Sequence, residues 1–330
     1  MPLELSLSET DVISALEKTT GTPIPCIAEV EGKTFGYSVV DRHVTALGLH
    51  HMKLAALPEI IGNLPALKVL DVSDNNLHNL PASIRNIQAL KQLHLHNNQL
   101  SFLPETVCTL QKLSVLYLSG NHLTSLPTAI ENLQALKELY LRDNQLVNLP
   151  KTIGNLQNLK ELYLSGNQLT SIPNTIGNLR ALKILALSNN QLSSIPSTAG
   201  NLRSLKIFDL ANNRLVNLPE TIGNLRNLRV IDLVNNQLTV LPATVGDLQA
   251  LNVLDISDNK VMVLPDQVGN LKSLNDLTLK NNQLTTLPDT IAHLHDLNIL
   301  NISGNRLIHL STEIRILIDE IKARGGKIVE

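Results

Sequence analysis

The sequence predicts an α/β solenoid, in which one short supersecondary unit is stacked repeatedly along most of the chain. Asparagine recurs every 23 residues, leucine-type residues recur in step with it, and a proline in each unit marks a change of local period. Repetition at this length indicates a solenoid and favours a binding role over a catalytic one. The repeated asparagines are Asn75, Asn98, Asn121, Asn144, Asn167, Asn190, Asn213, Asn236, Asn259, Asn282 and Asn305.

The first half of each unit has the pattern of a strand. In one clear copy, Leu162 and Leu164 alternate with Glu161, Tyr163 and Ser165. This period of two predicts a short strand with one buried face.

The second half of each unit changes period. After Pro173, apolar residues follow at spacings of three, at Ile176, Leu179 and Leu182. That spacing places them on one face of a short helix or 3₁₀ turn. The proline stands at the start of the turn, where its missing N–H is not needed.

Stacking is required because one strand and one turn cannot bury their leucines alone. Parallel strands about 4.8 Å apart would form a continuous sheet on one side, with the bulkier turns on the other. We therefore expect a curved stack with the sheet on its concave side. The repeated asparagine falls where the chain leaves the strand, and its buried amide suits bonds to the backbone of its own and adjacent turns. We interpret the asparagines as a structural ladder, not as ligands.

Aligned on the asparagine, each unit reads Leu-x-x-Leu-x-Leu-x-x-Asn-x-Leu-x-x-Leu-Pro-x-x-Ile-x-Asn-Leu-x-x. This resembles the leucine-rich repeat, and the resemblance covers twelve repeats over residues 44–310 without an insertion. The Leu-Pro-x-x-Ile-Gly-Asn-Leu segment is similar to the 23-residue repeats of intracellular proteins, including Ras-pathway scaffolds, plant Ras-group proteins, and bacterial and archaeal chains. The resemblance implies a right-handed horseshoe and a protein-binding role. It implies no catalytic residue, and it suggests a small GTPase partner by family analogy only.

Residues 1–43 lie outside the repeat and are predicted to form an N-terminal cap. A helix is expected from about residue 8 to Gly21, followed by a hairpin of strands at 26–30 and 34–40 that shields the first sheet edge. Met52 replaces the asparagine in the first repeat, as fits a terminal turn with no preceding coil.

Residues 311–330 are predicted to form a C-terminal cap. Ser311 replaces the recurrent proline, and the apolar spacing over 312–324 predicts an amphipathic helix that ends at Gly325 and Gly326. Residues 327–329 could add a closing strand. With a cap at each end, we expect the chain to be a complete protein.

Composition limits the class of partner. The net charge is −2, which gives no electrostatic case for nucleic acid. The N-terminus lacks the basic start and apolar run of a signal peptide, and no stretch approaches the length of a membrane span. The two cysteines, Cys26 and Cys108, are too few for cysteine-rich caps and are read as unrelated thiols. We therefore expect a cytoplasmic monomer that is not bound to a membrane.

Candidate chemistry is sparse. Gly32-Lys33-Thr34 resembles the end of a phosphate-binding loop, but Ile27 stands where that motif needs glycine. No grouping of residues suggests an enzyme. We expect no catalytic group and no cofactor.

Histidines could in principle hold a metal. His94 and His96 share a strand face and could chelate a metal with Asp71 on the adjacent strand. His50 and His96 are two repeats apart, about 9.6 Å by strand spacing, which is too far for one ion without help. We interpret these groups as solvated polar residues and expect no metal.

Function in a solenoid depends on the positions that the repeat leaves free. Three tyrosines occupy consecutive rungs of the middle strand column, and three aspartates occupy consecutive rungs further on. Tyrosine is a favoured interface anchor, and the acid row beside apolar residues would favour a basic partner segment. The predicted partner-binding residues on the concave side are His94, Tyr117, Glu138, Tyr140, Arg142, Glu161, Tyr163, Ile184, Ile207, Asp209, Val230, Asp232, Val253 and Asp255.

The same columns could instead reflect repeat consensus, since two neighbouring repeats share Leu-Lys-Glu-Leu-Tyr-Leu and β-branched residues favour strands whatever they bind. Three functional classes follow. The first is a non-enzymatic interaction module or scaffold that binds a protein on its concave sheet. The alternatives are a self-associating structural solenoid and a carbohydrate-binding protein that uses the tyrosines as a platform.

Overall fold

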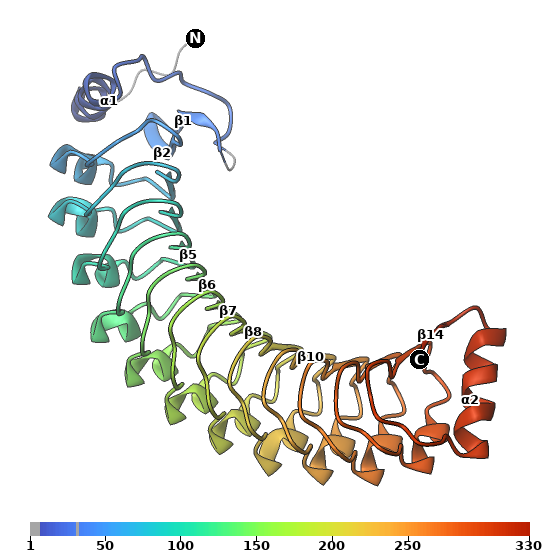
Figure 1. Cartoon of the computed structure of the whole chain (residues 1–330). Coiled ribbons are helices and arrows are strands. Elements are labelled where there is room, and N and C mark those ends of the chain that lie inside the picture. Colours follow the sequence, from blue (N-terminus) through green and yellow to red (C-terminus); the bar gives the residue numbers. More distant parts are fainter. Residues whose placement is uncertain (1–6, 31–32) are drawn as a thin grey trace. The chain divides into compact units, whose positions relative to one another are not determined.

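The computed structural model describes residues 7–30 and 33–330. Contacts within the chain divide it into two compact units, Met1–Leu162 and Tyr163–Glu330, which we call unit 1 and unit 2. In each unit, strands lie on the inner side of the coils and short 3₁₀ turns lie on the outer side (Figure 1). The expected α/β solenoid is confirmed in this form.

Unit 1 begins with a helix, and its strands then follow in sequence order with one 3₁₀ turn between successive repeats. Its helix and strands are α1 (Leu7–Thr20), β1 (Phe35–Val40), β2 (His43–Leu49), β3 (Val69–Asp71), β4 (Gln92–His94), β5 (Val115–Tyr117), β6 (Glu138–Tyr140) and β7 (Glu161–Tyr163), whose last residue opens unit 2. The 3₁₀ turns are η1 (Glu59–Asn63), η2 (Ala82–Asn86), η3 (Glu105–Thr109), η4 (Thr128–Asn132) and η5 (Lys151–Asn155).

Unit 2 continues the same alternation and ends in a helix and a strand. Its strands are β8 (Ile184–Ala186), β9 (Ile207–Asp209), β10 (Val230–Asp232), β11 (Val253–Asp255), β12 (Asp276–Thr278), β13 (Ile299–Asn301) and β14 (Lys327–Val329), with α2 (Thr312–Ala323) before the last. The 3₁₀ turns are η6 (Asn174–Asn178), η7 (Ser197–Asn201), η8 (Glu220–Asn224), η9 (Ala243–Asp247), η10 (Asp266–Asn270) and η11 (Asp289–His293).

The repeat length fixes the strand register. Strands pair in parallel with partners 23 residues apart, so Val230 lies beside Val253 and Asp232 beside Asp255. The central residue of each strand points into the core, where Ile231 and Leu254 are fully buried. Residues at the first and third strand positions point the other way, and we call the surface that they form the strand face.

Each 3₁₀ turn begins immediately after its proline. Pro173 has φ −69° and ψ 149°, an extended conformation, and its carbonyl accepts the N–H of Ile176 at 2.9 Å. Successive turns pack closely, because a Cβ added at Gly223 would lie 2.5 Å from the carbonyl oxygen of Thr244. This contact explains the glycine that recurs in the middle of the unit.

The asparagines form the predicted structural ladder. Asn213 is 8% exposed, and its Oδ1 accepts the N–H of Leu192 in the preceding coil at 3.0 Å. Its Nδ2 donates to the carbonyls of Leu187 and Leu210, both at 3.0 Å. One side chain thus joins two coils through backbone groups that would otherwise be buried without partners.

The N-terminal hairpin differs from the expected one. Helix α1 is present, but the strand expected at 26–30 is reduced to a single bridge between Cys26 and Tyr37. The hairpin instead joins β1 to β2, the first repeat strand, through Asp41 and Arg42, which both have positive φ. This turn conformation matches the twist of antiparallel strands, so β1 covers the edge of β2 directly. The turn expected at residues 31–33 lies partly outside the described residues, which omit residues 31 and 32.

The C-terminal elements lie where the sequence placed them. The Ser311 hydroxyl accepts the N–H of Ile314 at the start of α2, and Gly325 follows the helix with φ 79°. The apolar face of α2 is buried, and β14 pairs in parallel with β13. Among the described residues, no helix combines the length and apolarity needed to cross a membrane.

Candidate protein-binding surface

The strand face of unit 1 carries a column of rings. Strand register places Asp71 beside His94, His94 beside Tyr117, and Tyr117 beside Tyr140. The centroids of His94 and Tyr117 are 4.6 Å apart, and those of Tyr117 and Tyr140 are 4.3 Å apart with the planes inclined by 15°. His96, which follows β4, packs against the edge of Tyr117 with a centroid separation of 6.1 Å. The four rings form one contiguous aromatic platform.

Carboxylates border this platform at Tyr140. The Tyr140 hydroxyl lies 3.0 Å from Oε2 of Glu138 and 3.5 Å from Oε2 of Glu161. Burial, the neighbouring Tyr117 and the two glutamates raise the pKa of Tyr140 well above its ordinary value. The phenol therefore stays protonated and donates to the carboxylates at neutral pH.

A second polar cluster lies at the N-terminal end of the same face. Nδ1 of His50 and Nε2 of His96 lie 3.2 and 3.8 Å from the same carboxylate oxygen of Asp74. Nδ1 of His96 is buried without a hydrogen-bond partner. Strand spacing predicted that His50 and His96 lie too far apart to share one ion without help, and it did not reveal Asp74, which contacts both from the intervening coil. Even so, the described residues contain no group of three histidine, cysteine or acidic side chains placed to hold a metal.

Burial shifts the titration of the histidines. It lowers the pKa of His94 and of His96, although Asp71 opposes the shift at both and Asp74 opposes it at His96. Burial would raise the pKa of Asp71, but hydrogen bonds from the hydroxyl and N–H of Ser73 outweigh it and hold the pKa below its usual value. Both imidazoles are therefore mainly neutral at pH 7.

The strand face of unit 2 has a different composition. Ile184, Ile207, Val230 and Val253 form the first column in register, and Ile207 is 37% exposed. The apolar column ends at Asp276, which pairs with Val253 and is not among the predicted partner-binding residues.

The aspartates beside this apolar column have a local structural role. Oδ1 of Asp209, Asp232 and Asp255 accepts the N–H of the residue two positions later, at 3.2, 3.0 and 2.9 Å respectively. Burial and the charges of Asp209 and Asp255 raise the pKa of Asp232. The row thus supports the turn after each strand and also concentrates negative charge on the strand face.

The structure therefore divides the predicted partner-binding residues into two groups. In unit 1 it brings His94, Tyr117, Glu138, Tyr140 and Glu161 together. In unit 2 it aligns the four apolar residues with the three aspartates. The two remaining predicted residues belong to neither group. Arg142 is exposed next to β6, and Tyr163 is the first residue of unit 2.

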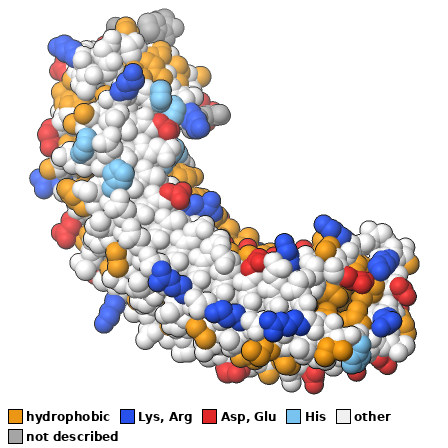
Figure 2. Space-filling model, in the orientation of Figure 1, with side chains coloured by type: hydrophobic (Ala, Val, Ile, Leu, Met, Phe, Trp, Pro, Cys, Tyr) orange, Lys and Arg blue, Asp and Glu red, His pale blue; other side chains and the backbone are white. Residues whose placement is uncertain are grey.

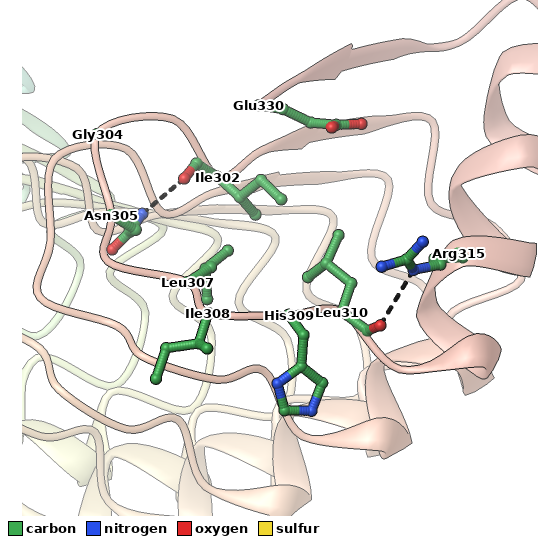
Figure 3. A pocket seen from close by; sticks show the side chains of 9 residues that line it. All are labelled: Ile302, Gly304, Asn305, Leu307, Ile308, His309, Leu310, Arg315 and Glu330. Carbon is green, nitrogen blue, oxygen red and sulfur yellow. Dashed lines mark hydrogen bonds between the residues drawn. The ribbon is translucent and has the colours of Figure 1, made fainter.

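A pocket of about 340 Å³ lies between the last coil and α2 (Figure 3). Two of its polar side chains are engaged by backbone groups. Nδ2 of Asn305 donates to the carbonyl of Ile302 at 2.8 Å, and Nε of Arg315 donates to that of Leu310 at 3.1 Å. We therefore interpret this pocket as the junction between the array and its terminal helix.

Comparison with known proteins agrees with the repeat geometry. The chain matches the leucine-rich repeat region over residues 83–167, 104–197 and 197–282, and the leucine rich repeat over residues 42–100. The chain belongs to the leucine-rich repeat family. No curated protein matches this leucine-rich repeat chain in sequence.

Solved structures extend the comparison. A leucine-rich repeat protein from Leptospira interrogans is 35% identical, with a TM-score of 0.62, and the match covers 87% of this chain and 84% of that one. The Arabidopsis receptor kinase HAESA, solved with the peptide hormone IDA and the co-receptor SERK1, is 26% identical with a TM-score of 0.68. That match covers 91% of this leucine-rich repeat chain and 56% of the receptor chain, so this chain spans about half the receptor's length. An internalin from Listeria monocytogenes shares the fold at 19% identity and a TM-score of 0.67, covering 98% of this chain and 94% of the internalin.

Proposed function

We propose that this leucine-rich repeat protein is a non-enzymatic interaction module that binds a partner protein on its strand face. The observation that carries the proposal is the aromatic platform of His94, His96, Tyr117 and Tyr140 in unit 1. Family membership supports it, because leucine-rich repeat proteins generally act as protein-interaction modules. The receptor HAESA, which resembles this chain, was solved with a bound peptide hormone.

The chemistry of the platform favours a partner segment that presents lysine or arginine. A cation over the face of a tyrosine ring is attracted by the ring quadrupole, and a carboxylate beside the ring strengthens the attraction. Glu138 and Glu161 supply carboxylates at the Tyr140 end of the platform. The row of aspartates beside the apolar column of unit 2 also favours a positively charged partner segment.

The test is affinity capture from the native organism, followed by binding measurements with the purified partner. We expect Tyr117→Ala combined with Tyr140→Ala to weaken binding at least about tenfold, as for paired interface anchors. Phe102→Ala is the matched control, since it removes an aromatic side chain that is 52% exposed outside the platform. A partner whose affinity survives the double substitution would refute the assignment of this surface.

A carbohydrate ligand is the second candidate, because stacked tyrosine rings also suit the apolar face of a sugar. A glycan array separates the two functions. Binding of a glycan that depends on Tyr117 and Tyr140, in the absence of any protein partner, would favour the second.

The finer assignments are proposals of the same kind. We propose a cytoplasmic scaffold with the 23-residue intracellular type of repeat, organised as a cap over residues 1–43, an array over 44–310 and a cap over 311–330. Fractionation of the native cells tests the location. Light scattering at micromolar concentration tests the expectation of a monomer against the alternative of a self-associating solenoid.

A further inference from the structure

The flank of unit 2 that leads into its strands carries a concentration of positive charge. Arginines follow the 3₁₀ turns η6, η7 and η8 at identical positions, and a second row of cations immediately precedes β8, β9 and β10. The two rows consist of Arg180, Arg203 and Arg226, and of Lys183, Lys206 and Arg229. All six side chains are exposed. Figure 2 shows lysine and arginine side chains following one another along the near side of the molecule.

The backbone holds these cations close together. The N–H of Lys206 donates to the carbonyl of Lys183 at 2.8 Å, and the N–H of Arg229 donates to that of Lys206 at 2.9 Å. In the other row, Nδ2 of Asn227 donates to the carbonyl of Arg203 at 2.8 Å. Adjacent coils therefore place the backbones of these like-charged residues at roughly the 4.8 Å spacing of paired strands.

No carboxylate in the described part of the chain forms an ion pair with these cations. The ion pairs found between described residues include none of the six. The corresponding positions in the next coil are the neutral Gln249 and Asn252, so both rows end there, whereas Lys137 and Lys160 occupy the second-row position in the two preceding repeats. The whole protein is slightly acidic, with a net charge of −2, which makes this local excess distinctive.

A pocket lies within the cluster. Arg203, Asn224, Arg226 and Asn227 line a space of about 450 Å³ between two successive coils. Asn227 uses its amide to hold the backbone of the preceding coil, and Arg203 and Arg226 line the pocket from neighbouring coils. Two guanidinium forks provide the planar, paired donors that match a tetrahedral oxyanion.

We propose that this pocket binds a phosphate group, with Arg203 and Arg226 as the principal donors. The outer cations, Arg180, Lys183, Lys206 and Arg229, raise the local concentration of a multiply charged anion. The site lies on the flank that precedes the strands. Phosphate binding there does not depend on the proposed binding of a partner protein to the strand face.

Two kinds of probe test the site in the full-length protein: inorganic phosphate by calorimetry, and a fluorescent phosphoserine peptide by anisotropy. We expect both to bind, and we expect the unphosphorylated peptide to bind at least tenfold more weakly. Arg203→Ala with Arg226→Ala should reduce both affinities at least tenfold. Arg203→Lys with Arg226→Lys should recover only part of the loss, because lysine keeps the charge but not the fork.

The matched control is Arg214→Ala with Arg306→Ala, which removes the same charge from exposed positions elsewhere in unit 2. Circular dichroism confirms that each variant is folded. Binding of inorganic phosphate that exceeds binding of the peptide would assign the site to a small phosphate compound, and the reverse would assign it to a phosphorylated protein. The proposal is overturned if neither probe binds at millimolar concentration, or if the control variant loses as much affinity as the pocket variant.

Discussion

Individual histidines on the strand face link the stability of unit 1 to pH. The pKa of His94 and that of His96 lie below the ordinary value because both imidazoles are desolvated. His96 is surrounded by Asp71, Asp74, His50 and Lys33, whose charges act in opposite directions. The net downward shift means that the unfolded chain binds protons more readily than the folded protein between the two pKa values.

We therefore expect the stability of the protein to fall as the pH is lowered from 7.5 to 5.5. The contribution of neutral His94 and His96 is complete above the unfolded pKa of about 6.5 and is lost as the pH falls towards the lower folded pKa values. The pKa of Asp71 is also lowered, so its contribution is lost only in more acidic solution, below its ordinary value of 3.8. Urea denaturation at both pH values measures the difference.

The double variant His94→Gln with His96→Gln should lose less stability over this interval than the unsubstituted protein. His78→Gln provides the control, because His78 is exposed in the same unit. An equal pH-dependent loss in the double variant would show that other groups cause it.

Single residues also show how far the sequence predicts the surface. The 23-residue register was sufficient to place His94, Tyr117 and Tyr140 in one column, because strand pairing fixes that neighbourhood. It could not predict the link through Asp74, because that contact depends on side-chain conformations across three coils. Asp74 follows β3 in the loop where the chain has positive φ, outside the strand columns.

At the scale of the elements, the loop after each strand is stabilised by its asparagine. Asn213→Ala removes the acceptor for Leu192 and the donor to Leu187 and Leu210. We expect a loss of about 2–4 kcal/mol in the free energy of unfolding, because buried backbone groups are left without partners. Denaturant titration monitored by circular dichroism measures this loss.

Asn201→Ala supplies the comparison for that substitution. Asn201 ends the 3₁₀ turn η7 of the same unit and is exposed, so its replacement should change stability by no more than about 0.5 kcal/mol. Similar losses in both variants would contradict the structural role assigned to the ladder.

The elements that the sequence predicted correctly are those that recur with the 23-residue repeat. Strand, proline and 3₁₀ turn recur in every unit, and each copy is evidence for the others. The N-terminal hairpin was assigned wrongly because it contains no repeat. The strand that pairs with β1 is β2, which belongs to the first repeat and was therefore not considered as part of a hairpin. The turn between them, at Asp41 and Arg42, also lacks the glycine that usually marks such a turn.

At the scale of the whole molecule, the core is a series of layers with no single centre. Each coil buries its leucines against the coils before and after it, so stability is approximately a sum of local terms. The terminal coils have a neighbour on one side only and depend on other elements to cover the other side. In unit 1, α1 and β1 provide that cover, and the carboxylate of Glu9 connects them to the array.

Glu9→Gln should therefore destabilise the N-terminal end of the array locally. Glu9 is 1% exposed, its Oε2 accepts the N–H of Val44 at 3.0 Å, and its Oε1 lies 3.2 Å from Nδ1 of His43. An amide has one terminal oxygen in place of two, so it cannot accept hydrogen bonds both from the N–H of Val44 and from Nδ1 of His43. We expect hydrogen exchange to accelerate in β1 and β2 and to stay unchanged in β10–β13, whereas Glu29→Gln at an exposed cap position should alter neither region. Faster exchange in β10–β13 as well would show that the array unfolds as one cooperative structure, because purely local coupling between neighbouring coils cannot carry the effect of a buried cap residue that far.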